Sequence, residues 1–129
     1  MSFTVEKRDD ISAIIITFHT DFGGGRQIKR YVSEIVDLLD NCDDPVYQIV
    51  DSADLKLSFN DVMLMIKEAV TNKQVISNHP NSKGIVIVTN KRFYKMAAKG
   101  LNTRSFGHLK LEIFESLDEA LNWVREQAA

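Results

Sequence analysis

Val46-Tyr47-Gln48-Ile49-Val50 and Gly84-Ile85-Val86-Ile87-Val88 are two short apolar runs on either side of a segment with a different period. Between them, apolar side chains recur at helical spacing, at Phe59, Val62, Met63, Ile66, Ala69 and Val70. A strand, a helix and a second strand in this order make a crossover unit, in which the two strands lie parallel. The stretch from Val46 to Val88 therefore predicts an α/β fold.

The residues before this unit predict a hairpin and a helix. Phe3 to Glu6 alternates between apolar and polar residues, and Ala13 to Phe18 is a β-branched, continuously apolar run. We expect an antiparallel hairpin whose second strand is buried on both faces. After Gly23-Gly24-Gly25, one apolar stripe predicts a helix that ends between Asn41 and Pro45; its members are Ile28, Val32, Ile35, Val36 and Leu39.

The residues after this unit complete the pattern. Lys91 to Lys99 predicts a helix that ends at Gly100. Leu109, Leu111 and Ile113 alternate with polar residues, as in a half-exposed edge strand, and a last apolar stripe consists of Leu117, Ala120, Leu121 and Val124. We therefore predict one α/β domain, residues 1–129, of order β-β-α-β-α-β-α-β-α. Its mixed, mostly parallel five-stranded sheet packs with four helices, the first strand being antiparallel to the other four.

Composition indicates a soluble cytoplasmic protein. The chain has 129 residues, enough to bury a core without metals or disulfides. Its single cysteine, Cys42, cannot form an internal disulfide, which is typical of a reducing compartment. The first residues are charged too early for a signal peptide, and the longest apolar stretch, Ala13 to Ile16, is far too short to span a bilayer.

Charge is strongly segregated along the chain. The segment from Lys83 to Lys110 has no acidic residue and seven basic ones: Lys83, Lys91, Arg92, Lys95, Lys99, Arg104 and Lys110. The formal net charge of −2 thus combines +7 in this segment with −9 in the remainder. Such segregation builds a local positive field. It predicts an anionic partner: an acidic protein surface, a phosphate group or a lipid headgroup.

Residues 91–110 include the helix that would carry this field. Thr89 or Asn90 is placed to cap it, and Lys91 and Arg92 lie in its first turn, where the helix dipole repels cations. Lys91, Lys95 and Lys99 are spaced by four, so they line one stripe and are expected to project together into solvent. The alternative is an ordinary solvated helix face, although such faces usually mix both signs of charge.

The glycine-rich loop from Asp21 to Gln27 is a second candidate site. Glycines let backbone N–H groups approach a ligand closely, and Arg26 can pair with an anion, so Gly24, Gly25 and Arg26 are candidate phosphate-binding residues. The alternative is a flexible turn. The run matches neither the P-loop spacing nor the dinucleotide fingerprint.

Asp51 and Ser58 flank the loop that follows the strand Val46–Val50. Asp51 lies where parallel sheets place their ligands, and it can face a ligand or accept hydrogen bonds from its own loop. Ser58 precedes Phe59, Asn60 and Asp61 in a sequence close to a capping box, which predicts a helix cap. A serine at a helix start also tolerates a phosphoryl group, so Ser58 is a candidate phosphorylation site.

No catalytic residues, metal site or cofactor are predicted. His19, His79 and His108 lie in distant segments without ligand spacing, and Cys42 has no adjacent partner. Nucleic acid is disfavoured as a partner, because the chain is acidic overall and few aromatic residues interleave with the basic ones.

The element order resembles that of the STAS-like superfamily, the fold of the SpoIIAA-like anti-sigma-factor antagonists. The likeness rests on Tyr47 to Asp51, Gly84 to Thr89 and the closing stretch from Phe114 to Val124, and it covers nearly the whole chain. The ending Glu-Ala-Leu-x-Trp-Val is similar to bacterial STAS-like proteins grouped with CRAL-TRIO lipid-binding folds.

The resemblance implies two properties. In antagonists a partner kinase phosphorylates a serine in an Asp-Ser-Ser-Gly-type motif at the start of the second helix; only Ser58 corresponds here, and the flanking Asp, Ser and Gly are missing. The related branch is thought to bind lipid-like molecules between sheet and helices. In this chain Phe59, Met63, Met65 and Ile66 are candidates to line such a pocket or simply to form core.

Two functions of different classes follow. The favoured prediction is a non-catalytic regulatory binding module that recruits an acidic protein or an anionic-headed amphiphile through the basic helix. The alternative is a small phosphate- or nucleotide-binding protein or enzyme that uses the Gly23–Arg26 loop with Asp51 and Asn90.

Overall fold

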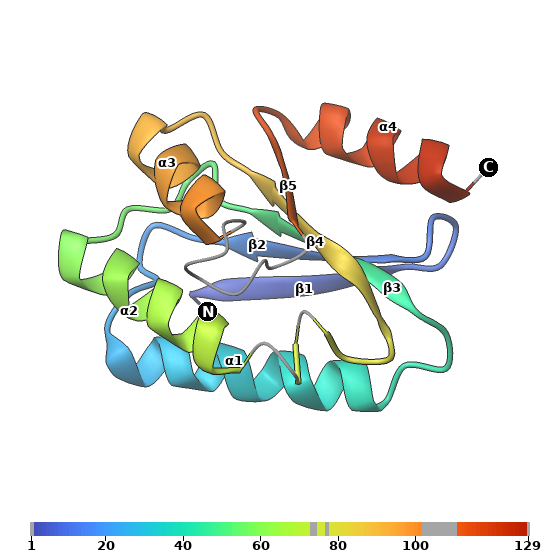
Figure 1. Ribbon diagram of the computed structural model, residues 1–129, viewed down its shortest axis with the longest axis horizontal. Coiled ribbons are helices and arrows are strands. Elements are labelled where there is room, and N and C mark those ends of the chain that lie inside the picture. The colour runs from blue at the N-terminus through green and yellow to red at the C-terminus, as the bar shows by residue number, and fades with distance from the viewer. Residues whose placement is uncertain (1, 73–74, 77, 102–110, 129) are drawn as a thin grey trace.

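The computed structural model describes residues 2–72, 75–76, 78–101 and 111–128 (Figure 1). Its elements follow the predicted β-β-α-β-α-β-α-β-α order: β1 Phe3–Arg8, β2 Ala13–Phe18, α1 Gly25–Asp40, β3 Val46–Asp51, α2 Phe59–Thr71, β4 Ser82–Val88, α3 Arg92–Leu101, β5 Leu111–Phe114 and α4 Leu117–Ala128. The α/β class predicted from the two apolar runs is therefore confirmed.

The five strands form one sheet in the order β1-β2-β3-β4-β5. β1 pairs with β2 antiparallel, and β2, β3, β4 and β5 are parallel, as predicted. Since each crossover advances one strand in the same direction, right-handed connections place α1, α2 and α3 on one face of the sheet. α4 follows the last strand and packs on the other face, against β3, β4 and β5.

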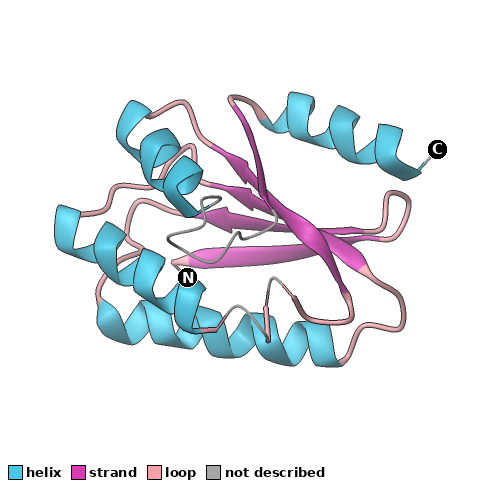
Figure 2. Ribbon diagram, in the orientation of Figure 1, coloured by secondary structure: helices cyan, strands magenta, loops and turns pink. Residues whose placement is uncertain are grey.

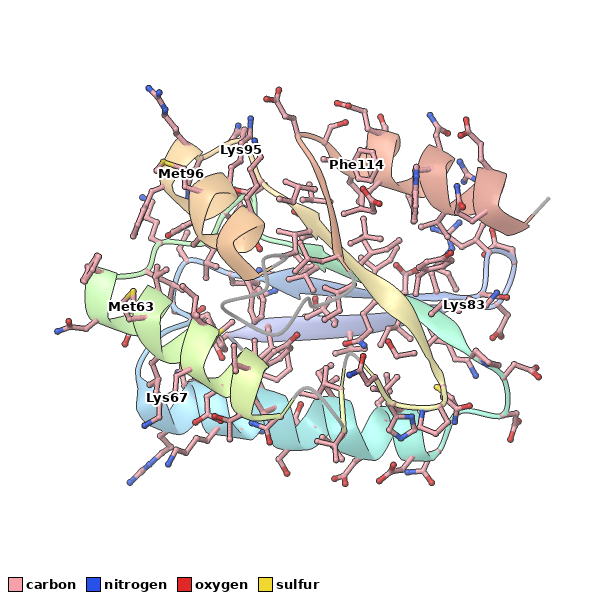
Figure 3. The ribbon with its side chains drawn as sticks, in the orientation of Figure 1. Met63, Lys67, Lys83, Lys95, Met96 and Phe114 are labelled. Atoms are coloured by element: carbon pink, nitrogen blue, oxygen red, sulfur yellow. The ribbon has the colours of Figure 1, made fainter. Side chains whose placement is uncertain are left out.

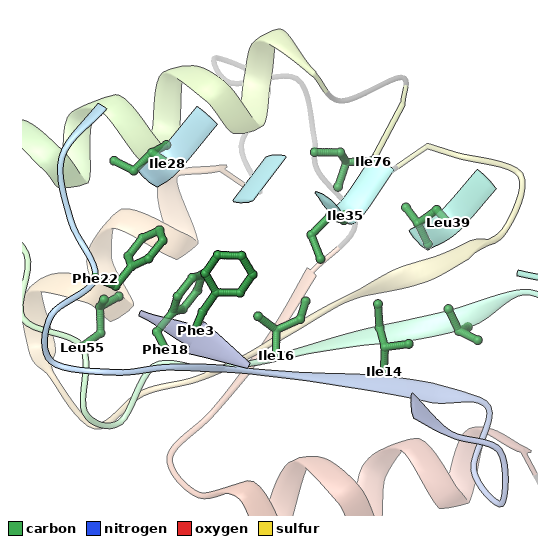
Figure 4. Close-up of a cluster of buried hydrophobic side chains, with 11 residues drawn as sticks. Phe3, Ile14, Ile16, Phe18, Phe22, Ile28, Ile35, Leu39, Leu55 and Ile76 are labelled. Atoms are coloured by element: carbon green, nitrogen blue, oxygen red, sulfur yellow. The ribbon is translucent and has the colours of Figure 1, made fainter. Parts of the chain in front are cut away.

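The layers are visible in Figure 2, where the sheet separates α1 and α2 from α4. β2 is buried on both faces, as predicted: Ile14 and Ile16 face the α1 side, and Ala13 and Ile15 face the α4 side. The core on the α1 side, drawn in Figure 4, joins β1 and β2 to α1 and the loop residues Phe22 and Leu55. The smaller core on the α4 side includes Ala120, Leu121 and Val124, three of the four apolar residues predicted for the last helix.

The predicted end of one helix differs from the structure. α3 continues through Gly100 to Leu101, so the prediction that Gly100 ends this helix is wrong. A glycine within a helix costs about 1 kcal/mol relative to alanine and does not by itself terminate it. β5 begins at Leu111, and the predicted start at Leu109 lies outside the described residues.

Candidate ligand-binding site

A cavity of about 170 Å³ lies between the sheet and the three helices that cover one face. Strand residues from β2, β3, β4 and β5 form its floor, and residues of α1, α2 and α3 form its walls. The floor residues alternate with those that face α4: Gln48 and Val50 face the cavity, whereas Ile49 packs on the α4 side.

Small side chains leave this space open. α2 contributes Ala69 to the wall, and α3 contributes Ala97 and Ala98. Alanine favours a helix but fills little volume, so two helices can cover the sheet without closing the space between them. Met65 and Ile66, two of the four residues named as candidates for a pocket or for the core, also line the cavity. The other two do not: Phe59 and Met63 are 63% and 45% exposed.

A few polar groups interrupt the apolar wall. Gln48 is buried and donates from Nε2 to Ser82 Oγ at 3.1 Å. Glu68 accepts from Asn72 Nδ2 at 3.0 Å through Oε2. Desolvation raises the pKa of the Tyr31 phenol, so its hydroxyl stays neutral. The wall is thus suited to an apolar ligand with few hydrogen-bonding groups.

The carboxyl edge of the sheet closes one end of the cavity with a polar cluster. Tyr94 of α3 accepts a hydrogen bond from the Leu57 N–H at 2.7 Å and lies 3.3 Å from the Leu55 carbonyl oxygen. Lys91 Nζ donates to the same carbonyl and lies 5.4 Å from the centroid of the Tyr94 ring. Since Tyr94 and Leu55 both line the cavity, Lys91 places a positive charge directly behind its wall.

The prediction that three lysines project together into solvent is wrong for two of them. Lys91 is half-buried and turned toward Leu55, and Lys95 forms an ion pair with Glu115. The Lys95 ammonium lowers the pKa of the Glu115 carboxyl. Lys99 and Arg92 are exposed, and no acidic partner is found for either among the described residues.

The positive segment is also divided in space. Lys83 lies near the amino end of β4, and Lys91 follows its carboxyl end, so about 20 Å of strand separates them. Figure 3 shows the two side chains apart, with Lys83 at the right of the view and Lys95 at the upper left. Arg104 and Lys110 lie outside the described residues.

The backbone N–H groups of the glycine loop donate hydrogen bonds to side chains of the protein itself, so they are not free for a ligand. The Gly23 N–H donates to Gln27 Oε1 at 2.8 Å, and the Gly24 N–H donates to Asp61 Oδ2 at 2.9 Å. Gly24 has φ +82°, which glycine adopts without strain. A carboxylate therefore already lies at this loop, and its negative charge disfavours a phosphate there. Gly25 begins α1, and Arg26 is exposed.

The other predicted edge residues have local roles. Asp51 Oδ1 accepts the Ala53 N–H at 3.2 Å, the loop-stabilising alternative considered for this carboxylate. Thr89 is buried, and its Oγ1 accepts the Lys91 N–H at 3.2 Å just before α3. Asn90 is exposed. Parallel topology brings these loops to one edge of the sheet, as predicted. Asp51 Oδ1 and Thr89 Oγ1, however, already accept hydrogen bonds from N–H groups two residues later in their own loops.

Ser58 caps α2, as predicted. Its Oγ accepts the Asp61 N–H at 3.1 Å, while the Asp61 carboxylate turns to Gly24 instead of completing a capping box. We expect Ser58→Ala to lower the free energy of unfolding by about 1 kcal/mol, because this N–H loses its acceptor. Urea denaturation measures the change. Ser33→Ala, at an exposed position inside α1, is the control, and an equal loss in both variants would contradict the capping role.

The described histidine and cysteine side chains do not gather into a metal site. His79 Nδ1 accepts the Asn81 N–H at 2.9 Å, and its Nε2 lies 2.7 Å from Asp40 Oδ1, so this ring connects the loop before β4 to the end of α1 at the amino edge of the sheet. Within the described residues, no group of three His, Cys, Asp or Glu side chains gathers in the way a metal ion requires. None of the described helices has the length and apolar character needed to cross a membrane.

Tyr94 and Gln48 were missed as site residues. Gln48 carries a visible signal, since it is the one polar residue in the run Val46–Val50 and implies a buried amide. Tyr94 carries no such signal, because its hydroxyl accepts a hydrogen bond from the Leu57 N–H, 37 residues earlier in the chain.

Comparison with solved structures identifies the fold. An uncharacterised protein of the DUF3478 family from Shewanella loihica PV-4, described as having a SpoIIAA-like fold, superposes with a TM-score of 0.60 at 15% sequence identity. The match covers 95% of this chain and 91% of that one. No family model and no curated protein matches the sequence. The chain thus has a SpoIIAA-like, STAS-like fold, which confirms the fold that the resemblance implied.

Proposed function

We propose that this protein is a non-catalytic binding module for a small amphiphile with an anionic head. The observation that carries the proposal is the 170 Å³ cavity between the sheet and the helices, whose lining is predominantly apolar. Well-packed cores rarely leave so large a space, because interiors normally reach the density of organic crystals. An apolar guest would restore the missing contacts.

Cavity volume limits the guest to a small apolar group. An engineered cavity of about 150 Å³ in another protein stays dry and binds benzene. By that measure, the space suits one aromatic ring or a chain of roughly six to eight carbons. A long fatty acyl chain is too large for it.

The polar cluster at the carboxyl edge supports an anionic head. Lys91 now donates to a neutral carbonyl, that of Leu55, and a carboxylate or phosphate would be a stronger acceptor for the same ammonium. The Tyr94 hydroxyl lies beside it as a second polar group. Glu68, elsewhere on the wall, disfavours a second negative charge in the guest.

Other classes of function have less support. No histidine or cysteine is among the described residues that line the cavity, so neither an imidazole base nor a thiol nucleophile is found there. The nucleotide alternative needs the glycine loop, where Asp61 already accepts the Gly24 N–H. Recruitment of an acidic protein through Arg92 and Lys99 is the second candidate, favoured by the exposure of both side chains.

Ligand-induced stabilisation tests the proposal. We expect octanoate and phenylacetate to raise the melting temperature by several degrees at saturation, because they bind only the folded protein. Octan-1-ol should bind more weakly, since it has no charge for Lys91, and palmitate should give no specific shift. Isothermal titration calorimetry supplies the affinities. A flat response to every short amphiphile would contradict the proposal.

A further inference from the structure

Four exposed apolar side chains form a patch on the outer faces of α2 and α3. We call Phe59, Met63, Phe93 and Met96 the aromatic–methionine patch; they are 63%, 45%, 44% and 65% exposed. The Phe59 and Phe93 rings stack with centroids 5.9 Å apart and an interplanar angle of 11°. This contact joins the two helices into one surface.

The patch is distinct from the cavity and from the core. Phe59 and Met63 are four residues apart on α2, and Phe93 and Met96 are three apart on α3, so each pair lies on one helix face. None of the four lines the cavity, and the opposite faces of both helices do so through Met65, Ile66 and the alanines. A contiguous exposed patch of large apolar side chains is typical of an interaction surface.

Exposed cations surround the patch. Arg92 precedes Phe93, Lys99 lies one helical turn beyond Met96, and Lys67 lies one turn beyond Met63, with Lys56 just before α2. None of these four forms an ion pair with a described residue. In Figure 3, Met63 and Lys67 on α2 lie at the same end of the molecule as Met96 on α3. The surface is therefore both apolar and positively charged.

The opposite end of the molecule is acidic. The last turn of α1, the loop after it and the hairpin turn between β1 and β2 lie at the amino edge of the sheet. They carry Asp9, Asp10, Asp37, Asp40, Asp43 and Asp44, of which Asp9 and Asp10 form ion pairs with Lys7 and Arg8. The patch lies toward the carboxyl edge, since α2 and α3 both begin there. This separation of charge would orient the patch toward a negative surface.

We infer that the aromatic–methionine patch docks on an anionic lipid bilayer. Its apolar side chains protrude rather than line a groove, so they suit a soft surface into which they can insert. A partner helix would instead require a groove to receive it. The cations complement acidic headgroups, each contributing attraction near the membrane surface.

Docking would bring the cavity next to a source of its ligand, and this part of the inference rests on the proposed function. α2 and α3 carry the patch outside and wall the cavity inside. An amphiphile that partitions into the bilayer would meet these two helices first. The partner surface and the ligand would thus share the same chemistry, an apolar body with an anionic head.

Vesicle co-sedimentation tests the inference with the full chain. We expect binding to vesicles of three parts phosphatidylcholine to one part phosphatidylglycerol at low salt, and little binding to phosphatidylcholine alone. Phe93→Ser with Met96→Ser should weaken binding about tenfold or more, because two inserted side chains are lost. Arg92→Gln with Lys99→Gln should weaken it on the order of 25-fold, or about fivefold for each cation.

Matched controls separate docking from folding and from ligand binding. Val5→Ser changes an exposed apolar residue on β1, and Lys29→Gln changes an exposed cation on α1; both should bind vesicles like the wild type. The two patch variants should still bind octanoate in solution without vesicles. If the wild type does not bind octanoate, the proposed function is contradicted, but the inference of vesicle docking still stands on its own result.

Two results would overturn the inference. One is failure of the wild type to sediment with the anionic vesicles, including the case in which it binds an acidic amphipathic peptide instead. The other is equal vesicle binding by the patch variants and the controls.

Discussion

Phe18→Ala is expected to lower the free energy of unfolding by about 3–5 kcal/mol. The Phe18 ring is 1% exposed and lies 4.3 Å from the Phe22 centroid and 5.0 Å from that of Tyr31. Its removal deletes these ring contacts and also enlarges the existing cavity, since Phe18 lines it.

Urea denaturation monitored by circular dichroism gives this change. Phe59→Ala is the matched control, because it makes the same substitution at a ring that is 63% exposed. It should cost less than about 1 kcal/mol, mainly through the lost stacking with Phe93. Equal destabilisation of the two variants would show that Phe18 is not part of a tightly packed core.

Ala98→Leu is expected to weaken the binding of short amphiphiles about 10- to 100-fold. Ala98 is 5% exposed and lines the cavity from α3, so an isobutyl group there would occupy space that the guest needs. The unliganded protein should keep its stability to within about 1.5 kcal/mol, because the added group enters open volume instead of a close-packed region.

Calorimetric titration with octanoate and urea denaturation together test this variant. Ala53→Leu adds the same group at an exposed loop position and should leave both measurements unchanged. Undiminished octanoate binding by a folded Ala98→Leu protein would place the ligand outside the cavity.

Much of the fold could be predicted because its signals are local. The run Ala13–Phe18 is apolar on both faces, and only a central strand buries both, so its place inside the sheet followed from composition. Ser58 followed by Asp61 marked the start of α2 for the same reason: a cap and its acceptor lie within one turn. The prediction that α3 ends at Gly100 was wrong, because a glycine marks a helix end only where the backbone leaves the helical conformation.

The candidate site was harder to predict from the sequence, because its contacts join residues that are distant in the chain. Lysines spaced by four predict a common stripe on a helix. In the structure, however, Lys91 donates to a backbone carbonyl 36 residues earlier, and Lys95 pairs with a carboxylate 20 residues later. Helical spacing cannot distinguish the face that lines a cavity from the face that meets solvent, and Phe59 and Met63 were therefore assigned to the wrong side of α2.

The amino-acid sequence by itself determined the element order, the α/β class, the doubly buried second strand and the segregation of charge along the chain. These properties depend on periodicity and composition, which act over a few residues. Only the tertiary structure decided the strand order, the side of the sheet covered by each helix, and the division of the lysines between buried and exposed positions. It also decided that alanines of α2 and α3 would line one open space, because packing volume depends on all surrounding elements at once.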